Sequence, residues 1–493
     1  MEEKKMHSPN IVHDNIEKLA SLFPHCVVET ADTQGKITKS IDFDLLRQEL
    51  CTSIVEGPQE RYQLNWPGKR EAIRKANAPI SKTVRPCREE SVDFDATQNI
   101  FVEGDNLDAL KLLQQTHLGT IKMIYIDPPY NTRKDFVYKD NFTESMGAYL
   151  LRSGVTDTDE HAALVQKEIQ GRFHSEWLSM MYARLKRARD LLRDDGVIFI
   201  SIDDSEVYNL TFICNEIFGE ACHLATFCWR RRKTQANLKK NVAPVHDFIL
   251  AFGKTDQAVI NRLPYDAEYI AKTFSNPDAD PRGPYQTRPL AQPSTAPNPS
   301  FAITLPNGRI ITAKWSCSVQ TFEQYKRENR LYIPKKGHGM PRLKVFLSES
   351  EGRLPNTWLA DIATTEQGTA ENKELFGKVV FDFPKPIKLI QYLLQLGTSP
   401  KENHIVIDFF AGSATTAHAV LQLNHEDGGN RRFIAVQRPE TCNKKSVAYK
   451  SGYSTIADIS KERIRRAGAK LRKEHPHTTK HLDIGFRVLK IDS

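Results

Sequence analysis

Residues 121–132 read Ile-Lys-Met-Ile-Tyr-Ile-Asp-Pro-Pro-Tyr-Asn-Thr, and this stretch decides the fold. Five of its first six residues are apolar or aromatic, which is typical of a strand buried in a parallel sheet. The two prolines end that strand in a stiff loop, because they fix φ and remove two backbone donors. Open α/β sheets bind ligands at such strand ends, so Asp127 and Tyr130 are candidate functional residues. A plain Asp-Pro turn explains the bare tetrapeptide equally well.

The loop at 127–130 offers the groups that chemistry at a nucleobase amine requires. An exocyclic amine is a poor nucleophile because its lone pair is delocalised into the ring. A carboxylate and a prolyl carbonyl only accept hydrogen bonds, so together they can bind both amine hydrogens and favour a pyramidal nitrogen. An aromatic ring can stack on a base that has left its helix. Asp127, the carbonyl of Pro128 and the ring of Tyr130 can provide these functions, and Pro129 stiffens the loop.

The composition favours a multidomain cytoplasmic protein. With 493 residues the chain should form two or three domains. It carries 69 Lys and Arg against 61 Asp and Glu, and the net charge of +8 suits a polyanion partner without requiring one. No stretch approaches the roughly 18 apolar residues of a membrane helix, and the first residues lack a signal peptide's apolar core. The eight cysteines include no Cys-x-x-Cys pair, which indicates reduced thiols and argues against a zinc site.

An α/β pattern occurs twice and is interrupted by a segment of different composition. We expect an accessory region with helices over 1–90, a first α/β half over 91–253 and a second over 376–493. Between the halves, residues 254–375 are rich in Pro, Asn, Gly and Ser, with a strong hairpin signal at Asn307-Gly308. This segment is predicted to be an inserted recognition region.

Hydrophobic periodicity locates the individual elements. Strands are predicted at 99–102, 121–126, 197–204, 223–229, 246–252, 404–408, 432–436 and 484–491. Helices are predicted at 10–23, 41–50, 107–115, 177–192, 206–218, 387–396, 415–423 and 454–473, with a further helix ending the segment 315–328. The alternation of strand and helix predicts parallel pairing through crossover connections.

Three polar segments lie outside this pattern. Residues 143–171 show no clear period and are predicted to be a mobile loop near the active site. The basic and aromatic segment 60–70 either contacts nucleic acid or docks Tyr62 and Trp66 on the main domain. The run Arg230-Arg231-Arg232-Lys233 is either a solvated face or a set of phosphate contacts.

A second candidate site follows the strand at 404–408. The sequence Asp-Phe-Phe-Ala-Gly-Ser-Ala at 408–414 is a turn of small residues between a strand and a helix, which brings backbone close to a cofactor. Glu440, after the next strand, is suitably spaced to hold ribose hydroxyls. The turn lacks the three glycines of a pyrophosphate cradle, which favours S-adenosylmethionine over a dinucleotide. Asp105, also at a strand end, can bind a nucleoside or cap the following helix.

The order of these motifs resembles that of the β-class DNA amino-methyltransferases, and in more detail the modification subunit of type III restriction–modification systems. The similarity covers the chain from about residue 10 onward. The matching motifs are Glu103-Gly104-Asp105-Asn106-Leu107, Asp127-Pro128-Pro129-Tyr130-Asn131-Thr132, Phe383-Pro384-Lys385-Pro386, Asp408-Phe409-Phe410-Ala411-Gly412-Ser413 and Gly485-Phe486-Arg487-Val488.

The resemblance implies a Rossmann-like α/β methyltransferase of circularly permuted motif order, which methylates N6 of a flipped adenine in double-stranded DNA of a prokaryote. It implies that Asp127, Pro128, Pro129 and Tyr130 bind and activate the adenine. It places the following residues around S-adenosylmethionine: Asp105, Lys385, Asp408, Phe409, Phe410, Gly412, Ser413 and Glu440. It also implies a homodimer, a restriction subunit as a further partner, and no metal ion.

Two features depart from the family pattern. Ala414 stands where the family commonly has glycine, and we expect its backbone to keep a negative φ, although its Cβ can crowd the cofactor. The chain stops at Ser493, where relatives usually continue, so a short natural form and a fragment are both consistent with it. Three alternatives stay open: N4 methylation of cytosine, a DNA-binding protein that has lost catalysis, and an RNA or protein amide substrate.

Overall fold

The computed structural model describes residues 11–22, 26–31, 37–43, 46, 64–132, 161–234, 242–305, 307–334 and 338–492. The chain forms two compact units. The first contains Met1–Asn261 and Asn356–Ser493, and the second contains Arg262–Pro355.

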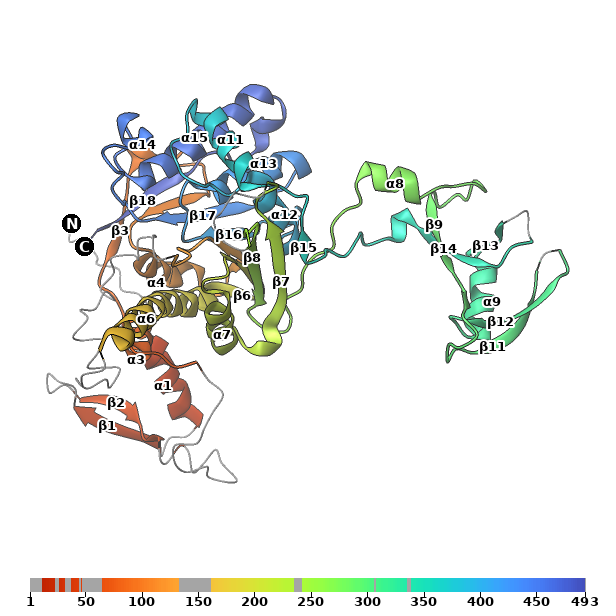
Figure 1. Cartoon of the computed structure of the whole chain (residues 1–493), viewed down its shortest axis with the longest axis horizontal. Helices are drawn as coiled ribbons and strands as arrows, with labels where there is room; N and C mark the ends of the chain where they lie inside the picture. Colours follow the sequence, from red (N-terminus) through yellow and green to blue (C-terminus); the bar gives the residue numbers. More distant parts are fainter. Residues whose placement is uncertain are drawn as a thin grey trace. The chain divides into compact units, whose positions relative to one another are not determined.

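The first unit is built on one ten-stranded sheet (Figure 1). In spatial order its strands are β15 (Trp358–Leu359), β7 (His223–Arg230), β8 (His246–Gly253), β6 (Leu192–Ile202), β5 (Ile121–Ile126), β16 (Ile405–Asp408), β17 (Arg432–Gln437), β4 (Ile100–Glu103), β18 (Arg487–Asp492) and β3 (Thr83–Pro86). From β6 to β18 all neighbouring strands are parallel. Strand β8 runs antiparallel to both β6 and β7, and β3 runs antiparallel to β18. The carboxyl ends of six central strands therefore meet at one edge of the sheet.

Helices cover both faces of this sheet (Figure 1). One face carries α3 (Lys69–Asn77), α4 (Asn106–His117), α6 (His161–Leu191) and α7 (Val207–Phe218). The other carries α11 (Thr365–Phe376), α12 (Ile387–Gly397), α13 (Thr415–Asp427) and α15 (Ile456–Glu474). Short elements of this unit are α14 (Val447–Lys450), η2 (Arg88–Glu90), η3 (Glu220–Cys222) and η5 (Thr478–His481). Because both faces are covered, all six residues of β5 are buried, as a continuous apolar strand requires.

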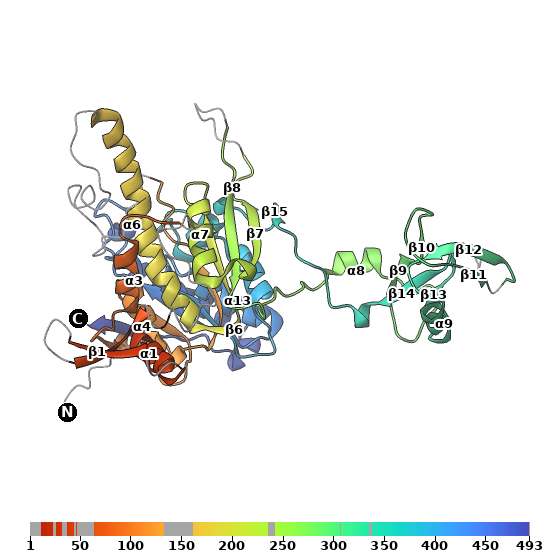
Figure 2. The same ribbon diagram turned by 90° about the horizontal axis from the view of Figure 1, so that it is seen from below.

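The long helix α6 corrects one expectation (Figure 2). Residues 161–171, predicted to be loop, form its first turns, while 143–160 lie outside the described residues. The segment contains Ala, Leu, Gln, Lys and Glu, which are strong helix formers, so propensity forms the helix where the apolar period is weak. No described helix is long and apolar enough to cross a membrane.

The accessory region 1–90 is not purely helical. The predicted helix at 10–23 is confirmed as α1 (Ile11–Leu22), but β1 (Val27–Ala31) and β2 (Ile37–Ile41) form an unpredicted antiparallel pair. The helix expected at 41–50 is wrong at Ile41, which ends β2, whereas Phe43 and Leu46 are helical; residues 44–45 and 47–50 lie outside the described part. Alternating Ile, Thr and Ser residues in β2 favour a strand there. Strand β3 and helix α3, also within 1–90, belong to the main sheet and its helical layer.

The second unit has its own small core around Trp315 and Phe322. It contains α8 (Ala267–Thr273), α9 (Val319–Arg327) and η4 (Leu347–Glu349). One sheet has the order β13 (Leu331–Tyr332), β14 (Arg342–Phe346), β9 (Tyr285–Pro289), and the other β10 (Ala291–Gln292), β12 (Ile310–Trp315), β11 (Ser300–Thr304). The hairpin predicted at Asn307-Gly308 joins β11 to β12, and Gly308 has the positive φ of 81° that the turn needs.

The inserted unit is shorter than the 254–375 that composition suggested. Helix α11 lies in the first unit, where it packs against α15. Its N-terminal Thr-rich and Gly-containing sequence resembles the preceding loops, which is why composition alone placed it in the insertion.

Candidate active site

The two candidate loops emerge side by side from neighbouring parallel strands. Met123 and Ile124 of β5 pair with Val406 and Ile407 of β16, so Asp127 and the turn that begins at Asp408 leave the same edge of the sheet. Segments almost 300 residues apart in sequence are therefore joined into one site by strand pairing. The resemblance to the amino-methyltransferases implied this juxtaposition.

Lys385 is held at the loop after β5, residues 127–131, which is called the target loop below. Its Nζ lies 2.5 Å from Oδ1 of Asp127 and 5.1 Å from the centroid of the Tyr130 ring. The Lys385 side chain is only 10% exposed and that of Asp127 30%. The resemblance placed Lys385 at the cofactor, and the structure adds that its ammonium bridges to the loop that would receive the base.

Two groups of the target loop, the carbonyl of Pro128 and the side chain of Tyr130, have distinct surroundings. The carbonyl of Pro128 makes no hydrogen bond within the described residues. The ring of Tyr130 packs against the main core, and its hydroxyl is buried. Burial, and then the neighbouring Asp127 charge, raise the pKa of Tyr130 well above its ordinary value, so the hydroxyl stays neutral.

Two contacts that the sequence did not reveal hold this loop in place. Trp177 of α6 donates its Nε1 hydrogen to the carbonyl of Pro129 at 2.7 Å. Asn131 has a left-handed backbone, with φ of 59°, and its Nδ2 donates to Glu206 Oε1 at 2.6 Å. The only sequence signal for Glu206 is that it follows a strand ending at the same sheet edge.

The turn after β16, residues 408–414, is called the cofactor turn below and is stabilised from within by Asp408. Its Oδ1 accepts from the backbone of Phe410 at 3.0 Å and its Oδ2 from the hydroxyl of Thr416 at 2.5 Å. Burial raises the pKa of Asp408 to about 7, against the opposing effect of these hydrogen bonds. Asp408 is thus oriented toward the turn itself, and its predicted contact with the cofactor stays a prediction.

The expectation for Ala414 was wrong. Its φ is 62° and its ψ 41°, the left-handed region, instead of a negative φ. The turn must reverse direction to start α13, and the carbonyl of Ala411 accepts a hydrogen bond from Ala414 N at 2.6 Å. Ala414 is fully buried, so its Cβ is covered by protein instead of lining an open cavity.

Helix α15 supports this turn from behind, which the sequence did not indicate. The hydroxyl of Ser460 donates to the carbonyl of Gly412 at 2.5 Å. Arg463, fully buried, donates through Nη1 to Ser413 Oγ at 2.7 Å and Thr415 Oγ1 at 2.8 Å. From the sequence α15 was simply a basic helix.

The loop after β4 reaches the same turn. Asp105 caps α4, accepting from the backbone of Leu107 and Asp108, which is the capping alternative considered above. Asn106 donates from Nδ2 to the carbonyl of Phe409 at 2.9 Å. Buried Arg184 of α6 donates to Asn106 Oδ1 at 2.5 Å, so it fixes the amide that holds the turn.

These residues fit a nucleoside cofactor that has no pyrophosphate. Residues 408–416 contain no Lys or Arg that would bind a pyrophosphate. Gly412 has φ of 53°, its N–H donates to Gln437 at 2.8 Å, and an added Cβ would lie 3.2 Å from the ring of Phe381. Glu440, half-buried and three residues beyond β17, is the acid available for ribose hydroxyls.

Comparison with known proteins decides the family. The family model described as DNA methylase matches residues 121–467, which contain the target loop, the inserted unit and the cofactor turn.

The chain belongs to the DNA methylase family.

Its curated relatives include restriction–modification enzymes. The methylase is 38% identical to the type III restriction–modification enzyme StyLTI Mod subunit of Salmonella typhimurium, over 92% of this chain and 70% of that protein. It is 32% identical to the EcoPI Mod subunit of Escherichia phage P1, over 96% and 77% of the two chains. It is 31% identical to the type II methyltransferase M.KpnI of Klebsiella pneumoniae, over 75% and 88%. The methylase is a DNA methyltransferase of the type III restriction–modification class, with S-adenosylmethionine as its cofactor.

The basic run of the methylase divides into members with different surroundings. Arg231 Nε lies 2.9 Å from Oδ1 of buried Asp247, and Arg230 lies 3.3 Å from Asp361. Lys233 is exposed. Burial raises the pKa of Asp247 to about 6, with the charge of nearby Asp127 adding to the rise and those of Lys385 and Arg231 opposing it. The run is thus not one uniform phosphate-binding surface.

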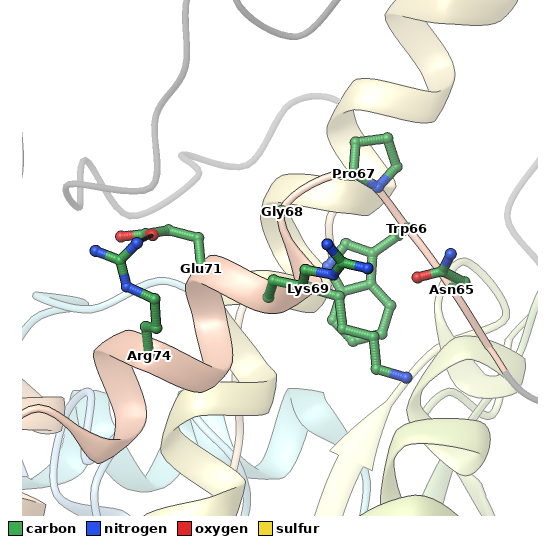
Figure 3. A pocket seen from close by; sticks show the side chains of 8 residues that line it. Asn65, Trp66, Pro67, Gly68, Lys69, Glu71 and Arg74 are labelled. Atoms are coloured by element: carbon green, nitrogen blue, oxygen red, sulfur yellow. Dashed lines mark ion pairs between the residues drawn. The ribbon is translucent and has the colours of Figure 1, made fainter. Parts of the chain in front are cut away.

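The aromatic segment before α3 docks on the methylase as one of the two alternatives predicted. Trp66 is buried, and its Nε1 donates to Ser179 Oγ of α6 at 2.9 Å. Around it lies a hollow of about 680 Å³, lined by residues of the segment before α3 and of the first turns of α3 (Figure 3). Lys69 there donates to Glu216 of α7 at 2.7 Å, so the segment ties α3 to its neighbours. Tyr62 lies outside the described residues.

Within the described part of the chain, no group of three or more His, Cys, Asp or Glu side chains could hold a metal ion.

Proposed function

We propose that the methylase modifies N6 of an adenine that has been rotated out of duplex DNA. One observation carries the proposal. A carboxylate, a prolyl carbonyl without another partner among the described residues and an aromatic ring lie at the end of β5, beside the turn that fits the cofactor.

The residues of the target loop account for the chemistry. When bound, S-adenosylmethionine supplies a methyl group activated by its sulfonium sulfur. Asp127 and the carbonyl of Pro128 accept the two amine hydrogens and hold the nitrogen lone pair toward the incoming carbon. Lys385 binds Oδ1 of Asp127 and leaves the other carboxylate oxygen for the amine. Asp127 therefore orients the amine, and the surplus proton can leave after transfer without a strong base.

The choice of adenine over cytosine rests on position 127. Cytosine N4 presents the same chemical problem, but aspartate at this position, where serine would favour cytosine, supports adenine. Nucleoside analysis of duplex DNA methylated by the purified chain distinguishes the two products. N6-methyladenine alone supports the proposal, and N4-methylcytosine contradicts it.

We further propose that Arg262–Pro355 reads the DNA sequence and that a restriction subunit is a partner. The first proposal is supported by the separate fold of this unit, which in the sequence lies between the two halves of the methyltransferase domain. The second is supported by the relatives' description as Mod subunits of restriction–modification enzymes. An exchange of this unit with that of a relative should change the site that is methylated, as sequencing of modified bases would show. The homodimer remains a prediction, which light scattering of the purified chain tests.

A further inference from the structure

Glu206 is a buried carboxylate placed next to the target loop. It precedes α7, and its side chain is fully buried. Its Oε1 accepts from Asn131 Nδ2 and His174 Nδ1, both at 2.6 Å, and its Oε2 accepts from Asn209 Nδ2 at 2.7 Å. These donors come from the target loop, α6 and α7.

The nature of Glu206 matters because a carboxylate only accepts hydrogen bonds. Its ion-pair partner among the described residues is His174, which is charged only if protonated, and no Lys or Arg pairs with it there. Because a carboxylate has only acceptors, the amide nitrogen of Asn131, and not its oxygen, must point toward it.

Asn131 transmits this orientation to the rest of the target loop. It directly follows Tyr130 and has the left-handed backbone that asparagine tolerates better than most residues. Its Nδ2 also donates to the carbonyl of Phe173 at 3.2 Å. With Trp177 holding Pro129, the loop is fixed on both sides of Tyr130.

We propose that Glu206 is a positioning residue for methyl transfer. It fixes Asn131, and through Asn131 the geometry of Asp127 and Tyr130, without touching the substrate. The inference rests on the proposed function of the target loop. It assigns a role to the carboxylate that connects α6, α7 and this loop.

The test replaces Glu206 by glutamine. Glutamine keeps one acceptor oxygen and presents an NH₂ group in place of the other, so one of the three donors must face that NH₂ group or turn away, and the hold on Asn131 is weakened. We expect the single-turnover rate of methyl transfer to fall about 10-fold or more, because small misplacements of reacting groups cost rates of this order. Cofactor affinity, measured by calorimetry, should stay within about 2-fold, because the cofactor turn makes no contact with Glu206.

Glu216→Gln is the matched control. Glu216 also lies on α7 and accepts from Lys69 at 2.7 Å and Tyr182 at 2.9 Å, but it does not contact the loop. It loses a charged acceptor on the same helix, so it should lower thermal stability and leave the single-turnover rate within about 2-fold. Equal rate losses in the two variants would show a general structural effect and overturn the proposal.

Asn131→Gly provides the second arm. Glycine keeps the left-handed backbone and removes the amide, while Glu206 retains two donors. If Glu206 acts through Asn131, Glu206→Gln should slow the glycine variant little further. If Glu206→Gln slows the Asn131→Gly variant as much as it slows the natural chain, the proposal is overturned. A normal transfer rate for Asn131→Gly also overturns it. That second result decides alone if Glu206→Gln does not fold. If Asp127→Ala is inactive while both variants are normal, this inference fails and the proposed function stands.

Discussion

The ammonium of Lys385 lies 2.5 Å from the carboxylate of Asp127, although the two residues are 258 positions apart. The approach of Lys385 is determined by α11. An added Cβ on Gly368 would lie 2.3 Å from the carbonyl of Pro384, so only glycine lets the helix pack there. Glu371 of the same helix accepts the backbone N–H of Ile387 at 2.9 Å. The two halves of the methyltransferase domain are therefore joined at the carboxylate of Asp127.

Lys385→Met should slow methyl transfer by about 10- to 100-fold, because a charge-assisted hydrogen bond that holds Asp127 is worth about 1.5–3 kcal/mol. Methionine keeps most of the side-chain volume and removes the charge. Lys388→Met is the matched control, since Lys388 is exposed on α12. The check is the single-turnover rate with saturating cofactor. A rate for Lys385→Met equal to that of the control would show that the ion pair is dispensable.

Ala414→Gly should stabilise the methylase by up to about 1 kcal/mol. Alanine at φ of 62° carries a left-handed penalty that glycine lacks, and the gain is reduced by the greater freedom of glycine when unfolded. Ala419→Gly, inside α13, should have the opposite sign because its backbone is helical. Denaturant unfolding compares the two. Destabilisation of both variants would contradict the left-handed assignment at position 414.

The stability of the methylase should depend on pH through Asp408. Because burial raises its folded pKa to about 7, the folded protein binds a proton there that the unfolded chain has lost. The stability contributed by this proton is present at low pH and falls as the pH rises from about 4 to about 7. Asp408→Asn removes this proton-binding site. The free energy of unfolding of the natural chain, relative to that of the variant, should therefore decline between about pH 4 and about pH 7. A constant difference, or one that grows with pH, would contradict the raised pKa.

The basic run should separate into two effects. Lys233→Gln, at an exposed residue, should weaken binding to all DNA alike and lower the salt slope by about 1. Arg231→Gln should in addition slow methyl transfer, because it removes the guanidinium that lies 2.9 Å from Asp247 beside the active site. Binding titrations over a range of salt concentrations, together with single-turnover rates, measure both. Identical behaviour of the two variants would contradict this division.

The sequence predicted those parts of the fold that local pattern determines. Strand β5 was predicted at its observed bounds, because a continuous apolar run ended by two prolines leaves little freedom in register or length. The position of Asp127 at the end of that strand followed from the same run of residues. These features depend on short-range chemistry that is visible in a single stretch of residues.

Other parts of the site depend on tertiary contacts that no local pattern contains. The left-handed backbone of Ala414 occurs in a turn held by Ser460 and Arg463, which are contributed by a helix more than 40 residues away. Glu206 gains its significance only through the folded position of Asn131. Helix α11 was missed because its sequence resembles that of the preceding loops. The reason for its glycine, the close approach of Gly368 to the carbonyl of Pro384, is visible only in the folded chain.

The most direct test of the account is the Asp127→Ala variant in a single-turnover assay with labelled S-adenosylmethionine and duplex DNA. Loss of a preorganised acceptor at the target amine should reduce the rate about 100- to 1000-fold, while calorimetry shows cofactor affinity within a few-fold of the natural chain. Asp204→Ala, at an exposed acid that follows the neighbouring strand β6, is the matched control and should leave both quantities unchanged. A near-normal transfer rate in Asp127→Ala would contradict the claim that this carboxylate holds the amine for methylation.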